Sequence, residues 1–177
     1  MPRRLWFVLT ALVALPVPAA AQIVVSLPST TLTTTMTATV SEQARVSVPA
    51  GVLFTVGDIG ASTEATAAAV TVDQIVLASA AKQIRVSVQA DAASFTPPDI
   101  GAPTRAATAV SWNAASWTNA TGTQGVLSSA SYNTVATCTA GVSDCSTNDL
   151  VFTLAPNTNI TTAGSHVLTV TWKIESL

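Results

Sequence analysis

The sequence predicts an all-β protein, a single antiparallel β-sandwich domain of the immunoglobulin-like or jelly-roll type. Apolar and polar residues alternate with a period of two in many short segments, and no segment has a convincing helical period. Turn-forming residues separate these segments at short intervals, as they do in antiparallel sandwiches. With 177 residues, the chain is long enough for one domain with a substantial core.

A secretory signal peptide is predicted at residues 1–21. Arg3 and Arg4 supply positive charge, Leu5–Val17 supplies an apolar core, and Ala19–Ala21 supplies the small residues of a cleavage site. The alternative is a retained membrane anchor. The apolar run is about 13 residues, shorter than the ~20 that span a bilayer, and it contains a proline. We therefore expect a cleaved leader and a mature chain in the periplasm, on the cell surface or outside a bacterium.

Cleavage before Gln22 leaves residues 22–177 as the sandwich domain, with no later segment long and apolar enough to span a membrane. Residues 22–40 form either the first strand or an N-terminal arm. The segment Leu32–Thr39 within it is rich in threonine. The candidate strand residues of this arm alternate at its beginning: Ile23, Val25 and Leu27.

The remaining eight to ten strands are predicted from alternation bounded by turns. The clearest segments are Val46–Val48, Val52–Val56, Val70–Leu77, Gln83–Ala90, Val110–Trp112, Tyr132–Ala136, Asp149–Leu154 and Val167–Glu175. In the last of these, Leu168, Val170, Trp172 and Ile174 share one face, which is typical of a half-buried strand. In Val70–Leu77 the apolar phase slips by one residue, which predicts a β-bulge or a bend between sheets.

The charge pattern argues against nucleic acid or an anionic membrane as a partner. Charged residues are 9% of the chain, against about 25% in ordinary soluble domains. Removal of Arg3 and Arg4 leaves five basic and nine acidic residues, a formal charge of −4, and the basic residues do not cluster. Hydroxyl groups of serine and threonine take the place of charges on the expected surface.

Cys138 and Cys145 are the only two cysteines. In an oxidising compartment they are expected to form a disulfide that closes the loop Thr139–Asp144. The alternative is a metal or redox pair. With His166 as the single histidine, the spacing fits no zinc site.

We expect no enzymatic activity, no cofactor and no metal site. His166 is interpreted as a histidine at the rim of the last strand, because no nucleophile motif accompanies it. The carboxylates are scattered without a paired spacing, as a glycosidase would require. Asp58 and Asp99 lie beside glycines and are expected to cap turns; calcium is the alternative there, but no calcium-loop pattern supports it.

Four aromatic residues carry the remaining functional hypotheses. Trp112 and Trp172 continue apolar strand faces and are expected in the core. Trp117 lies in a loop rich in alanine, threonine and glycine, and together with Tyr132 it is the candidate contact for a sugar ring or a protein partner. The alternative is that Trp117 packs against the edge of the sandwich.

The segment Ala163–Trp172 resembles the final strand of exported bacterial sandwich proteins. Chaperone–usher pilin subunits and WxL-type surface domains close with a similar Ala-Gly-x-aromatic-x-x-Thr-Val-Thr pattern. Val46–Asp58 and Lys82–Gln89 are also similar to a group of uncharacterised secreted bacterial β-sandwich proteins. The resemblance implies an immunoglobulin-like sandwich on or outside a bacterial cell.

These observations favour a non-enzymatic structural or adhesive surface protein, such as a pilus or filament subunit. Such a subunit associates with itself or with other surface proteins, and Ile23, Val25 and Leu27 are the candidate donor strand for addition to a neighbour's sheet. The alternative function is a carbohydrate-binding module that uses Trp117 and Tyr132. A hydrolase is a third hypothesis, for which the sequence offers no set of acid and base residues.

Overall fold

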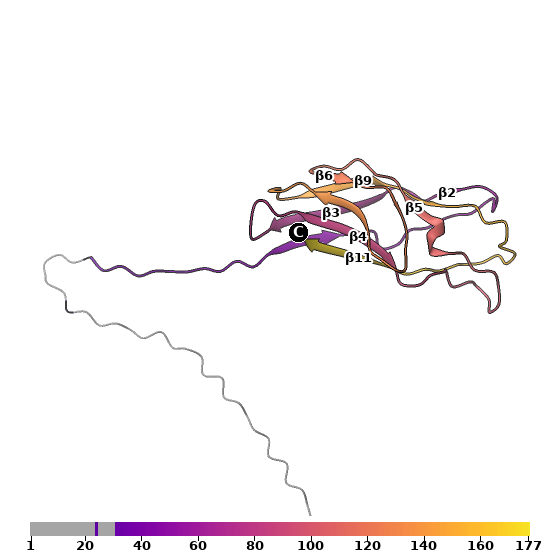
Figure 1. Cartoon of the computed structure of the whole chain (residues 1–177), viewed down its shortest axis with the longest axis horizontal. Coiled ribbons are helices and arrows are strands. Elements are labelled where there is room, and N and C mark those ends of the chain that lie inside the picture. Colours follow the sequence, from indigo (N-terminus) through magenta and orange to yellow (C-terminus); the bar gives the residue numbers. More distant parts are fainter. Residues whose placement is uncertain (1–23, 25–30) are drawn as a thin grey trace, which may run out of the picture. The chain divides into compact units, whose positions relative to one another are not determined.

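The computed structural model describes residue 24 and residues 31–177. Within it, Thr39–Leu177 forms one compact unit, an antiparallel β-sandwich (Figure 1). The fold class predicted from the alternating pattern is therefore confirmed. The predicted signal peptide at residues 1–21 and the candidate donor residues Ile23, Val25 and Leu27 lie outside the described residues.

Eleven strands are described, and all their pairings are antiparallel. They are β1 (Gln43–Ser47), β2 (Thr63–Glu64), β3 (Ala68–Val76), β4 (Ile84–Ala90), β5 (Val110–Trp112), β6 (Ala120–Gly122), β7 (Gly125–Val126), β8 (Asn133–Cys138), β9 (Cys145–Leu150), β10 (Phe152–Leu154) and β11 (Val170–Ser176). Along residues 31–177 the only helical element is a 3-10 turn, η1 (Ala107–Ala109). The sequence predicts eight to ten strands, and the short β2, β6 and β7 lie outside the predicted segments.

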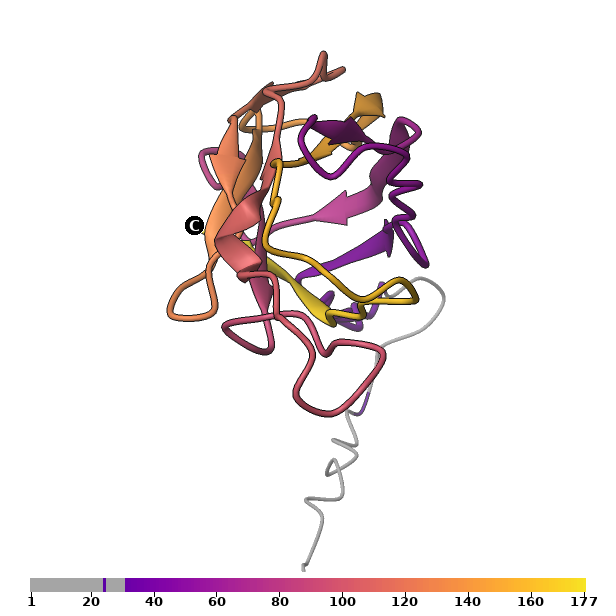
Figure 2. The ribbon, with the colours of Figure 1, turned by 90° about the vertical axis from the view of Figure 1, so that its right-hand side faces the viewer.

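The strands form three sheets. Sheet A has the order β1-β3-β9, sheet B has the order β2-β10-β5-β7, and sheet C has the order β11-β4-β8-β6. Figure 2 shows the sheets wrapped around a common interior. The chain passes from sheet A to sheet C between β3 and β4, and from sheet A to sheet B between β9 and β10.

One apolar cluster joins the three sheets. Val70 and Val72 of β3 and Val86 and Val88 of β4 are all fully buried. Trp112 of β5 is buried as predicted, and its ring lies 6.3 Å from that of Phe152 on the neighbouring β10. The indole Nε1 of Trp112 donates a hydrogen bond to the carbonyl oxygen of Thr123 at 2.8 Å, which satisfies the buried polar group.

The irregularity predicted in Val70–Leu77 is a β-bulge in β3. Arg45 pairs with Asp73 and Gln43 pairs with Val76, so β3 has one extra residue opposite β1. Gln74 at this point has a φ of 51°, which returns the apolar side chains after it to the core side.

The predicted strand Val52–Val56 is wrong. Residues 48–62 contain no strand, because this segment leaves the edge of sheet A after β1 and crosses to the edge of sheet B at β2. Only Phe54 packs against the core, whereas Val52 and Val56 are exposed. Alternation in a crossing segment therefore does not imply pairing.

The predicted strand Asp149–Leu154 is divided between two sheets. Leu150, Phe152 and Leu154 all point into the core, as predicted. The strand breaks at Val151, where the chain leaves sheet A as β9 and enters sheet B as β10. The predicted segment Gln83–Ala90 corresponds to β4, and the last strand begins at Val170 rather than Val167.

Candidate assembly site

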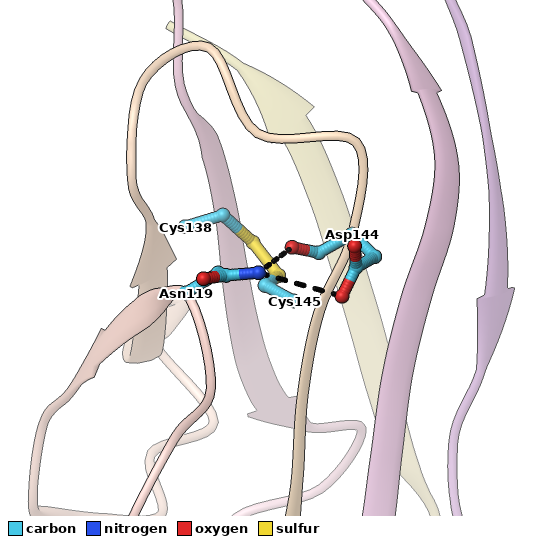
Figure 3. The surroundings of a disulfide bond; sticks show 4 residues. All are labelled: Asn119, Cys138, Asp144 and Cys145. Carbon is cyan, nitrogen blue, oxygen red and sulfur yellow. Dashed lines mark hydrogen bonds between the residues drawn. A yellow bond between two sulfur atoms is a disulfide. The ribbon is translucent and has the colours of Figure 1, made fainter.

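One side of the sandwich, between sheets A and C, is closed by covalent and backbone bonds. The predicted disulfide is confirmed: Cys138 of β8 and Cys145 of β9 are bonded, with their Cα atoms 5.8 Å apart (Figure 3). Thr118 and Ser146 exchange two backbone hydrogen bonds, of 2.8 and 3.2 Å, between the segment leading to β6 and strand β9. Asn119 adds a side-chain bond to the carbonyl oxygen of Asp144 at 3.2 Å (Figure 3).

The opposite side of the sandwich has two strand edges. In the part of the chain that the structure describes, β1 pairs with β3 alone and β11 pairs with β4 alone. Figure 1 shows β11 beside the indigo β1, and the two strands run in opposite directions because the start of β1 meets the end of β11. We call this side, with its strands β1 and β11, the open seam.

The apolar side chains of the open seam are incompletely covered. Trp172 and Ile174 of β11 pair with Val88 and Val86, which are fully buried, but are themselves only partly buried. Val46 of β1 lies opposite the fully buried Val72 and is 37% exposed. The apolar core is therefore not fully shielded from solvent along this side.

The two edges differ in regularity. All seven residues of β11 pair with β4 without a register shift, from Val170 opposite Ala90 to Ser176 opposite Ile84. By contrast, β1 has five residues and a bulge opposite it. A long regular edge is the better template for another strand, whereas bulges and short strands disfavour pairing. The free edge of β11 is thus the more suitable acceptor.

A carboxylate latch ties one end of the open seam. Glu42, just before β1, accepts hydrogen bonds from the Lys82 ammonium at 2.8 Å, from the Ala78 amide at 2.7 Å and from the Ser176 hydroxyl at 3.1 Å. The bond from Lys82 is the main reason that the pKa of Glu42 falls to about 2, with the Ala78 amide next in importance. Glu42 therefore fixes the point at which the preceding residues join the sandwich.

The latch could not be predicted from sequence. The partners of Glu42 lie 36, 40 and 134 residues further along the chain, and no local pattern links them. The one sequence feature that points to Glu42 is its position just before the first strand of the sandwich.

Further ion pairs reinforce the two edge strands. Arg45 of β1 makes a bidentate pair with Asp73 of β3, at 2.7 and 2.9 Å. On the outer face of sheet C, Glu175 of β11 pairs with Lys173 and with Arg85 of β4. These contacts lower the pKa of Asp73, through Arg45, and the pKa of Glu175, through Lys173 first and Arg85 second. Both edge strands are thereby held in their own sheets.

Residues 31–40 precede the latch. They have no regular secondary structure, and all ten side chains are exposed. The exposed fractions of the large apolar ones are 62% for Leu32, 91% for Met36 and 70% for Val40. This described part of the predicted arm thus offers apolar side chains that the chain's own core does not use.

The two candidate glycan contacts belong to different parts of the sandwich. Trp117 is partly buried against the core, and its ring lies beside Gly122 of β6, where any larger residue would collide with it. Gly122 pairs with Ala136, and Tyr132 lies four residues before Ala136, roughly 13 Å away at about 3.3 Å per residue.

Tyr132 is instead paired with a charged side chain. It is 40% exposed, and the Lys173 ammonium lies 5.5 Å from the centre of its ring. Trp117 packs against the core, and Tyr132 contacts Lys173. Glycan binding through these residues stays a prediction.

His166 is partly buried, and its Nε2 lies 3.4 Å from the carbonyl oxygen of Thr162, in the turn before β11. This agrees with a position at the rim of the sandwich. Across residues 31–177, no helix has the length and apolar character needed to cross a membrane.

Comparison of the chain with family models, with curated proteins and with solved structures finds no match in any of the three.

Proposed function

We propose that this protein is an exported, non-enzymatic structural or adhesive subunit of a bacterial surface assembly, such as a pilus or filament, and that its copies associate by strand addition. The observation that carries the proposal is the open seam, with the regular edge of β11 and the partly covered Trp172 and Ile174 beside it. In strand addition, backbone hydrogen bonds supply affinity and alternating side chains set the register.

The energetics favour a strand in this position. A further strand would satisfy backbone groups at the edge of β11 and would remove apolar surface from water, at about 25 cal/mol per Å². A regular edge strand of a soluble protein is normally blunted by a bulge, a proline, charged side chains or a covering segment, because it otherwise pairs with another chain. In β11 the charged residues Lys173 and Glu175 pair with each other. The sequence of β11, Val170–Ser176, contains no proline, and its pairing with β4 has no bulge.

Export is supported by two independent features. The residues of the predicted leader have the order of charge, apolar run and small residues that secretion requires. The disulfide Cys138–Cys145 is typical of proteins that fold in an oxidising compartment.

A non-enzymatic role agrees with the way the charged side chains are used. Four of the five basic residues after the predicted leader form ion pairs: Arg45, Lys82 and Arg85 pair with residues of other segments, and Lys173 pairs with Glu175 of its own strand β11. The fifth, Arg105, is buried and donates a hydrogen bond to the carbonyl oxygen of Ala155. These positive charges therefore have structural partners within the domain.

Light scattering after size-exclusion chromatography tests the proposal. The full chain is expressed with its leader, and the exported form, expected to begin at Gln22, is compared with a form that lacks residues 22–39. We expect the exported form to assemble as its concentration rises and the shortened form to stay monomeric, because Thr39–Leu177 is a compact unit with an unfilled seam. Stable monomers of both forms at every concentration would contradict strand addition through the arm.

A further inference from the structure

The segment of residues 31–40 has the alternation of a two-faced β-strand. Its odd-numbered positions are all threonine: Thr31, Thr33, Thr35, Thr37 and Thr39. Its even-numbered positions are Leu32, Thr34, Met36, Ala38 and Val40, four of them apolar. In an extended chain successive side chains point to opposite faces, so the segment has one threonine face and one mainly apolar face. Threonine and valine also favour strands.

The two-faced segment of residues 31–40 is not itself a strand in the structure. Residues 31–40 are exposed and without regular structure, whereas strands with the same alternation, such as β4, are paired on both sides and buried. The segment therefore has the sequence of a half-buried strand and the exposure of an unpaired one. A sheet with a free edge and uncovered apolar side chains would supply both the backbone pairing and the burial that this segment lacks.

The segment cannot easily fill the seam of its own chain. Val40 is separated from β1 by Ser41 and Glu42 alone, so folding back along β1 would require a two-residue turn at these positions. Two-residue hairpin turns need residues with positive φ, usually glycine or asparagine. Neither Ser41 nor Glu42 has a positive φ, and the side chain of Glu42 is held by three hydrogen bonds. A longer turn would include Ala38–Val40, so these residues could not also form part of the paired strand.

The segment is also distinct from the alternating residues near the mature N-terminus. Ile23, Val25 and Leu27 occupy odd-numbered positions, whereas the apolar residues of 32–40 occupy even-numbered ones. Pro28 lies between the two groups, and proline lacks the amide proton that a paired strand donates. The two groups therefore cannot present one continuous apolar face.

We propose that residues 32–40 form the strand that a second copy of this chain receives in its open seam. Leu32, Met36, Ala38 and Val40 cover the partly buried side of β11, and the threonines face outward, as Thr171 of β11 does. The inference rests on the proposed strand addition, and it assigns the donated strand to residues 32–40 in place of Ile23, Val25 and Leu27. Nine residues at about 3.3 Å each span roughly 30 Å, enough to pair with all seven residues of β11.

Paired substitutions on the two faces of the segment test the assignment. Met36→Asp places a charge on the apolar face, and Thr35→Asp places the same charge on the threonine face one residue away. Val25→Asp places it on the N-terminal group. All three are measured in the exported protein by light scattering over a concentration series, with the thermal unfolding of the sandwich as a control for folding.

We expect Met36→Asp to abolish assembly and Thr35→Asp to retain it, because only the first charge would have to be buried. Equal effects of Met36→Asp and Thr35→Asp on assembly would overturn the proposal that the apolar face of residues 32–40 is the buried one. Assembly that survives Met36→Asp but is lost in Val25→Asp would overturn the assignment to residues 32–40 and leave strand addition intact. An unsubstituted protein that never assembles would overturn both proposals.

Discussion

Glu42 links three parts of the sandwich that are far apart in sequence. Its carboxylate joins the start of β1 to Ala78 and Lys82 in the loop between β3 and β4, and to Ser176 at the end of β11. A charge-assisted contact of this kind depends on the ionised carboxylate. The latch therefore makes the stability of the open seam sensitive to acid.

We expect Glu42→Gln to flatten the acid dependence of stability. The pKa of Glu42 is lowered from 4.5 to about 2 in the folded protein, so the unfolded chain binds more protons between these values. The stabilisation is thus fully present above pH 4.5 or so and is lost as the pH falls towards 2. Denaturant unfolding at a series of pH values measures this: the variant should be less stable than the native protein at pH 6 and should lose less stability on acidification.

Glu64→Gln, at an exposed position on β2, is the matched control and should keep the acid dependence that Glu42→Gln loses. If Glu42→Gln retained the full slope between pH 4.5 and 2, the latch would not stabilise the folded state. The lowered pKa values of Asp73 and Glu175 act in the same direction and account for part of the remaining slope.

At the scale of single elements, the disulfide hairpin of β8 and β9 contrasts with the open seam. Both cysteines are buried, and they join strands that belong to different sheets. Together with the bonds between Thr118 and Ser146, the disulfide closes one side of the sandwich covalently. On this side the segment before β6 is therefore already bonded to β9, whereas β1 and β11 on the other side each pair with one strand.

Replacement of both Cys138 and Cys145 by serine should lower the free energy of unfolding by about 2–3 kcal/mol, because the short loop is no longer closed in the unfolded chain. Urea unfolding measures the difference. We expect dithiothreitol to release no thiol from the native protein and to act once urea has unfolded it, because both sulfur atoms are buried. Unchanged stability of the double variant would contradict this account.

The strands show how far the sequence determines the structure. The faces of β4, β10 and β11 could be predicted, because a strand between core and solvent must alternate. The bulge at Gln74 could be predicted from the slip in phase. The prediction of a strand at Val52–Val56 was wrong because alternation indicates which side chains face inward, not whether a partner strand lies alongside.

The candidate site was less predictable than the fold. Which strands lie at the edges depends on the order of strands in each sheet, and this order comes from long-range pairings that a local pattern does not contain. The sequence indicates the arm as a candidate donor, but local alternation alone does not show whether residues 31–40 pair with another strand or are exposed.

At the scale of the whole molecule, the basic residues pair within the domain, whereas several apolar residues stay exposed or only partly covered. The basic residues after the leader have partners within the sandwich, and charged residues are 9% of the chain. Uncovered apolar side chains occur both in the open seam and in residues 32–40. The two surfaces are similar in apolar character and in length, and the proposed strand addition would bring them together.

Hydrogen exchange at low and high protein concentration tests this claim most directly, because it locates the contact as well as detecting it. Assembly through the open seam should slow exchange in β11 and in residues 32–40, and should leave the disulfide side, β6 and β9, unchanged. If the protein assembled with exchange in β11 unaltered, or with protection confined to β6 and β9, the seam would not be the site of association.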